Sequence, residues 1–184
     1  MNHPLEFIPS ANRRVIFLTF FVWAMVMTAV MQNVGTPLKT SAAPSGIVSF
    51  ELARTATKAG EILASWNPTQ TLYAAFGLGV DYLYMPSYAL AIALAVLLTM
   101  TRHKGWFVSL GVWVGWGSLV AALFDATENF ALWKILLGNV QSMWPMIAAV
   151  CATIKFALIL LGLGYAILGG ILPKRRPEPV EGSK

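Results

Sequence analysis

Four long stretches of apolar residues, separated by short polar segments, run along this chain of 184 residues. They cover about residues 15–32, 72–100, 106–126 and 146–172, and the third continues in a helical pattern to about residue 137. Each stretch is long enough to cross the roughly 30 Å hydrocarbon core of a bilayer as an α-helix. The pattern therefore predicts an all-α integral membrane protein, built as a bundle of four transmembrane helices.

A different pattern lies between the first two spans. Over about residues 49–66, apolar side chains recur at the spacing of one helical face, while Glu51 and Arg54 lie largely off that face. This stretch is too short and too polar to span a membrane, so we expect an amphipathic helix that lies on the membrane surface or covers the end of the bundle. Its predicted apolar face consists of Leu52, Ala56, Ala59, Leu63 and Trp66.

The basic residues predict how the bundle is oriented. Pairs or triplets of Lys and Arg at 13–14, 102–104 and 174–176 flank alternate crossings, so with four spans they all fall on one side. Because cytoplasmic loops are enriched in Lys and Arg, we expect both termini in the cytoplasm and the amphipathic helix on the extracytoplasmic side. Residues 1–172 are predicted to form one membrane domain, and residues 173–184 a basic cytoplasmic tail that is disordered.

The composition supports a lipid environment and excludes nucleic acid as a partner. Hydrophobic residues make up 57% of the chain and charged residues 11%, against about 25% charged residues in soluble domains. The net charge of +5 comes from basic residues that flank apolar spans, where they contact anionic lipid head groups. A single cysteine and the absence of glycosylation acceptors are typical of a bacterial cytoplasmic (inner) membrane protein.

Ionisable residues inside three of the spans form the candidate site. At about 1.5 Å of rise per residue, Asp81, Asp125 and Lys155 lie roughly 25–28 Å from the cytoplasmic ends of their helices. The three are thus expected to converge at one level, near the outer edge of the hydrocarbon core. Because an unpaired charge at this depth is costly, we predict that Lys155 pairs with Asp125 or Asp81.

Other polar residues share the helix faces of these three. Tyr84 and Tyr88 follow Asp81 on one face, and Glu128 and Asn129 follow Asp125. The amphipathic helix is expected to reach over the same site as a lid. The predicted polar cluster consists of Asp81, Tyr84, Tyr88, Asp125, Glu128, Asn129 and Lys155, with Glu51 and Arg54 on the lid.

No metal site and no cofactor is predicted for this cluster. Carboxylates such as Asp125 and Glu128 suit a hard cation, but Lys155 would repel one, and His or Cys ligands are not found near them. His3 and His103 fall in predicted cytoplasmic segments, where we expect them at the surface. Glycine motifs for nucleotide phosphates are missing from the sequence.

Small residues indicate where the spans pack on one another. Gly111, Gly115, Ser118 and Ala122 form a stripe on the third span that leads to Asp125, and glycines recur on the fourth span. Without a hydrophobic drive between helices in lipid, such residues allow close backbone approach. The stripe is therefore expected to face another helix.

These patterns favour a multi-pass membrane protein with an outward-facing polar pocket that binds a lipid head group or an amphiphilic ligand. Two alternatives remain open. One is a membrane-embedded enzyme that acts on lipid with a carboxylate as acid or base. The other is a structural subunit or assembly factor of a membrane complex. Membrane lipids are the expected partners, with a membrane-protein partner or a second copy of the chain left open.

Overall fold

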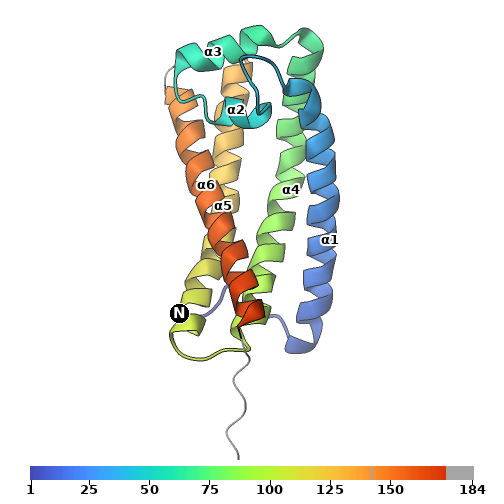
Figure 1. Ribbon diagram of the computed structural model, residues 1–184, viewed down its shortest axis with the longest axis vertical. Helices are drawn as coiled ribbons and strands as arrows, with labels where there is room; N and C mark the ends of the chain where they lie inside the picture. Colours follow the sequence, from blue (N-terminus) through green and yellow to red (C-terminus); the bar gives the residue numbers. More distant parts are fainter. Residues whose placement is uncertain (142, 173–184) are drawn as a thin grey trace, which may run out of the picture.

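The computed structural model describes residues 1–141 and 143–172, and within these ranges all regular secondary structure is helical (Figure 1). Four of the helical segments are long and apolar enough to cross a membrane. The predicted tail over 173–184 lies outside the described residues. In chain order the elements are α1 (Ser10–Gly35), the 3-10 turn η1 (Thr36–Leu38), α2 (Ile47–Glu51), α3 (Ala56–Ser65), α4 (Pro68–Met100), α5 (Trp106–Leu136) and α6 (Met143–Ile171).

The four long helices match the four apolar stretches, but three of them begin earlier than the hydrophobic pattern indicates. The start of α4 shows why. Asn67 Oδ1 accepts a hydrogen bond from the Gln70 backbone N–H, and Gln70 Oε1 accepts one from the Asn67 N–H, each at 2.9 Å. This reciprocal capping box, with Pro68 in the first turn, starts the helix before the apolar run begins.

The predicted single amphipathic helix over 49–66 is wrong, because the structure has two short helices, α2 and α3, in this region. The chain turns between them at Arg54, which has a φ of 60°. Thr55 then caps α3, because its side chain accepts a hydrogen bond from the Lys58 N–H. The buried face also differs from the predicted one: Ile62 is fully buried, whereas Leu52 is 39% exposed.

The long helices form two pairs, α1 with α4 and α5 with α6, and α4 joins the first pair to the second. Helix α4 packs on α1, α5 and α6, and α5 packs along α6. Figure 1 shows α1 beside α4, with α5 and α6 across from them and α2 and α3 crossing one end of the bundle. Within the described residues, α1 has no comparable contact with α6, and Met27 is its one buried residue. Helix α1 is therefore a peripheral helix held mainly by α4.

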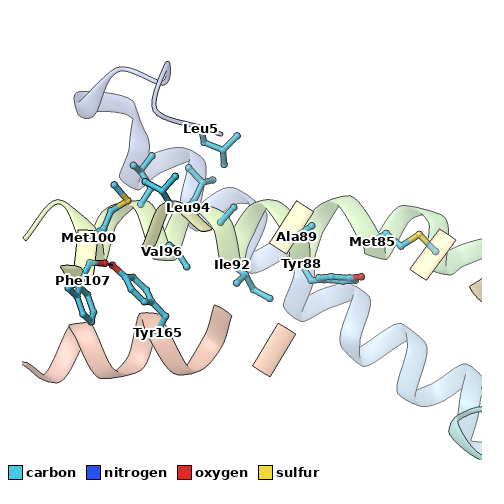
Figure 2. Packing of buried hydrophobic residues seen from close by; sticks show 13 residues of the cluster. Leu5, Met85, Tyr88, Ala89, Ile92, Leu94, Val96, Met100, Phe107 and Tyr165 are labelled. Atoms are coloured by element: carbon cyan, nitrogen blue, oxygen red, sulfur yellow. Dashed lines mark hydrogen bonds between the residues drawn. The ribbon is translucent and has the colours of Figure 1, made fainter. Parts of the chain in front are cut away.

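Two apolar cores lie at opposite ends of the bundle. Figure 2 shows the core at the C-terminal end of α4, where the ring of Tyr165 stacks on Phe107 with centroids 4.3 Å apart. The Tyr165 hydroxyl also donates a hydrogen bond to the Phe107 carbonyl at 2.8 Å. The other core lies under α3, where Trp66 is buried and its indole N–H donates to the Leu38 carbonyl at 2.9 Å. These contacts fix α3 across the bundle end.

Several glycines of α5 and α6 lie where side chains from other segments fill the space next to the backbone. A Cβ at Gly111 would collide with Tyr165, and one at Gly162 would collide with Ile92. A Cβ at Gly115 would meet the imidazole of His3. The predicted stripe on α5 thus faces α6 in part, but its centre receives the N-terminal segment of the chain.

The expectation that His3 lies at the surface is wrong. Only 3% of His3 is exposed, because the segment before α1 folds back against α5. The Nδ1 of His3 accepts a hydrogen bond from the Leu5 N–H at 3.2 Å, and the Trp116 indole donates to the Asn2 carbonyl at 3.1 Å. A sequence pattern does not reveal this contact, since the absent side chain of Gly115 is what makes room for it.

Acidification is expected to release this N-terminal segment from α5. Burial lowers the pKa of His3 from 6.5 to about 4. Because folding favours the neutral imidazole, its contribution to stability is complete above about pH 6.5 and is lost as the pH falls toward about 4. Amide hydrogen exchange of residues 2–8, corrected for the intrinsic rate, should become faster in this window. The His3→Asn variant should lack the step and His103→Asn should keep it, so a step that survives His3→Asn would contradict the assignment.

Candidate functional site

A buried ion cluster centred on Lys155 lies between α5 and α6. The Lys155 ammonium is 2.9 Å from Asp125 Oδ1 and 2.8 Å from Glu128 Oε2, and all three side chains are at most 7% exposed. The pair predicted between Lys155 and Asp125 is therefore present, with Glu128 as a second partner. The ammonium also lies 4.7 Å from the centroid of the Phe156 ring. One cation is thus shared by two carboxylates away from solvent.

Helix α4 supplies the next layer of the cluster. The Tyr88 hydroxyl donates to Asp125 Oδ2 at 2.6 Å, so both oxygens of Asp125 are bound. Asp81 accepts a hydrogen bond from the Asn129 amide at 2.8 Å and, contrary to the second predicted option, it is not the ion-pair partner of Lys155. Hydrogen bonds therefore connect α4 to α5 at this level.

The cluster lies well inside the bundle, several helical turns from the helix ends. At about 1.5 Å per residue, Asp81, Asp125 and Lys155 are roughly 16–20 Å from the ends of their helices that lie near α3. Each is also buried, with 8%, 2% and 5% of its surface exposed, respectively. The three residues therefore share one level, and they form a buried network.

Helix α2 brings Glu51 to this network. Glu51 is the last residue of α2, it is 9% exposed, and its Oε2 has no hydrogen-bond partner among the described residues. Burial raises the pKa of Glu51. The positive charge of Lys155 opposes this rise, the negative charge of Asp125 adds to it, and a hydrogen bond between the Glu51 and Glu128 carboxyl groups opposes it. The predicted lid thus contributes a carboxylate to the site.

Arg54, the other predicted lid residue, does not reach the cluster. It lies in the turn after α2, and its side chain is exposed. The reason is the break between α2 and α3, since an unbroken helix would have placed Arg54 about one turn from Glu51 on the same face. The expectation that Arg54 covers the site is wrong.

Tyr84 lies beside the cluster and connects α4 to α1. Its hydroxyl is 2.9 Å from the Thr28 hydroxyl, and its ring packs edge-on against Tyr88 with centroids 5.2 Å apart. The Thr28 hydroxyl also donates to the Ala24 carbonyl at 2.8 Å. Thr28 is not among the predicted site residues, because a threonine in an apolar run commonly bonds its own helix backbone.

A groove with a volume of about 460 Å³ lies next to the cluster, between α1 on one side and α4 and α6 on the other. Its walls are mostly apolar, and α2 covers one end of it. The lining residues Phe21, Met25 and Leu163 are 43–54% exposed, so the groove opens sideways between α1 and α6. Its polar lining consists mainly of Thr28, Glu51, Asp81, Tyr84, Tyr88, Asp125, Asn129 and Lys155.

The chemistry of this lining is dominated by acceptors. Tyr88 and Asn129 already donate to Asp125 and Asp81, and Lys155 already contacts two carboxylates. The ammonium of Lys155 lies between Asp125 and Glu128, at the position that a metal ion would need in order to bridge them. Glu51, by contrast, lines the groove and has a buried Oε2 without a hydrogen-bond partner among the described residues. The arrangement is therefore suited to binding a donor, not to bridging a metal.

Comparison of the chain with protein-family models, with curated protein sequences and with solved structures found no match, so the geometry of the site itself is the basis for its interpretation.

Proposed function

We propose that this chain is a multi-pass membrane protein that binds an amphiphilic molecule in the groove between α1, α4 and α6. The apolar chain of the ligand would lie along the groove, and its polar head would lie against the cluster beneath α2. One observation carries the proposal: an apolar groove of about 460 Å³ ends at a buried set of charged side chains. Pockets for small ligands typically have volumes of about 300–1,000 Å³ and combine apolar walls with a few polar groups.

The sideways opening supports a ligand that comes from the lipid phase. Exposed apolar side chains of α1 and α6, among them Phe21 and Leu163, flank this opening. In a bilayer these surfaces would contact acyl chains, and a lipid or a single-chain amphiphile would reach the groove without crossing water. At the covered end, Phe50 and Trp66 pack edge-on, which supports a closed roof above the head group.

We also propose that the end covered by α2 and α3 faces the outside of a bacterial cytoplasmic membrane. Arg13 and Arg14 precede the apolar part of α1, and Arg102 and Lys104 lie in the turn between α4 and α5. Both groups are at the end of the bundle away from α2 and α3 (Figure 1). Lys and Arg are enriched on the cytoplasmic side of membrane proteins. This orientation gives the groove an outward-facing polar end.

Filling the groove from either wall is expected to abolish ligand retention. Ala24 of α1 and Ile159 of α6 both line the groove, so Ala24→Trp and Ile159→Trp each place an indole in it. Native mass spectrometry of the protein extracted in a neutral maltoside detergent would report which lipids or added amphiphiles stay bound. Both variants should lose adducts that the parent protein keeps.

Ala29→Trp is the matched control, because Ala29 is an exposed residue of α1 outside the groove lining. It should retain the adducts of the parent protein. If the two groove variants keep the same adducts as Ala29→Trp while melting at the same temperature as the parent, the groove is not a binding site and the proposal is wrong.

A further inference from the structure

The polar end of the groove contains many more hydrogen-bond acceptors than donors. Three carboxylates line it, from Glu51, Asp81 and Asp125, together with the ammonium of Lys155, which Glu128 contacts from outside the groove lining. Ionised carboxylates are acceptors alone, each with about four lone-pair positions. The donors that face them are already bound to partners, so additional donors would have to come from a ligand.

Glu51 is the carboxylate best placed to receive such donors. Its Oε2 is buried without a hydrogen-bond partner in the described part of the chain, and the residue lines the groove. A buried acceptor left unbonded is unfavourable, and more so when it is charged. Glu128 also has unbonded carboxylate oxygens, although its Oε2 lies within ion-pair distance of Lys155. Of these two carboxylates, Glu51 is the one that lines the groove.

The balance of charge also discriminates between head groups. An anionic head group would have to displace carboxylates from Lys155 and lie beside several negative charges. A cationic head group would reduce the excess negative charge, and in this low-dielectric setting the attraction is stronger than in water. The burial that raises the pKa of Glu51 makes a proton the competitor of such a cation at this carboxylate.

We infer that the groove takes a single-chain amphiphile whose head group is a cation that donates hydrogen bonds, a long-chain primary amine being the simplest example, and that Glu51 binds this head group. The inference rests on the proposed function, because it names the ligand class for the same groove. Glu51 Oε2 accepts from the ammonium of the ligand, and Asp81 and Asp125 add negative charge nearby.

The test compares amphiphiles that share one chain and differ in the head group. Dodecylamine, dodecanol and dodecyl phosphate would be titrated into the whole chain in a neutral maltoside detergent, with bound ligand measured by native mass spectrometry. Dodecylamine should bind about tenfold or more tightly than either of the others. Glu51→Gln should reduce its affinity by about tenfold to a hundredfold, as expected for one charge-assisted hydrogen bond.

Glu61→Gln is the matched control, because Glu61 lies on α3, is exposed, and pairs with Lys58 at 3.1 Å. It should bind dodecylamine like the parent protein. Glu51→Gln should melt no lower than the parent protein, since it removes a buried carboxylate with an unbonded oxygen.

Each remaining outcome has a definite meaning. Equal binding of the three head groups, lost in Ala24→Trp, would overturn the inference and leave the groove as a binding site. Tightest binding of dodecyl phosphate would overturn it in favour of recognition by Lys155. If no amphiphile binds the parent protein more than Ala24→Trp, both the inference and the proposed function fail.

Discussion

Replacing Lys155 with methionine is expected to lower the free energy of unfolding by about 3–5 kcal/mol, which corresponds to a drop in Tm on the order of 10 °C. Among the described residues, the ammonium is the one positive charge in contact with Asp125 and Glu128, both of which are at most 2% exposed. Methionine fills a similar volume but leaves these carboxylates buried without a counter-charge. They would then have to take up protons or draw water into the bundle.

Thermal melting of the purified variant in detergent measures this effect. Lys58→Met is the control, because Lys58 forms an exposed pair with Glu61 and such pairs contribute little to stability. Adding Asp125→Asn to Lys155→Met should restore part of the lost Tm, since it removes one of the uncompensated charges. A Lys155→Met protein that melts with the parent would show that the carboxylates are already protonated, and that the ion pairs do not stabilise the fold.

Gly162→Ala is expected to destabilise the bundle by about 1–3 kcal/mol, the usual cost of overpacking. Gly162 lies on α6, where a Cβ would collide with the side chain of Ile92 and come within 3.2 Å of Ser118 Oγ. Both neighbours belong to buried parts of α4 and α5, so α6 would have to move away from them. The same shift would displace Lys155 two turns earlier on α6.

Gly164→Ala, two residues away on the same helix, is the matched control. Nothing lies within 4 Å of a Cβ at Gly164. Alanine has a higher helix propensity than glycine by about 1 kcal/mol, so this variant should melt at the same temperature as the parent or higher. If both variants lower Tm equally, loss of glycine flexibility and not the contact with Ile92 would be the cause.

The long helices follow well from the sequence, because an apolar run of this length matches the thickness of a bilayer and is rare in the core of a soluble domain. The sequence also predicts that Asp81, Asp125 and Lys155 meet. The rise per residue fixes their heights, and because an unpaired charge facing lipid is unfavourable, their side chains are expected to face the bundle interior. Height alone does not distinguish Glu128 from Asp125 as the partner of Lys155, since Glu128 is one turn from Asp125 on the same helix face.

The rest of the site depends on contacts that a hydrophobic pattern does not contain. The break between α2 and α3 depends on a local turn at Arg54 and a cap at Thr55, which override the helical spacing of apolar residues. That break separates Glu51, which reaches the cluster, from Arg54, which does not. The groove itself exists because α1 packs on α4 and leaves α6 uncovered, and the apolar run of α1 would have been the same in a closed bundle.

The way α1 is attached bears on which ligands the proposed site in the groove would tolerate. The turn η1, which directly follows α1, is fastened to the start of α4, because the Gln70 side chain donates to the Pro37 carbonyl at 2.7 Å. At mid-height, Thr28 and Tyr84 form a polar contact between α1 and α4. A bulkier or branched chain would therefore displace the middle of α1 at the cost of this hydrogen bond and of apolar packing on α4, while the end covered by α2 and α3 stays in place. Such a site would discriminate weakly between ligand chains of different thickness, because the α1 wall can move. It would discriminate strongly between head groups, because the ion cluster is held rigidly.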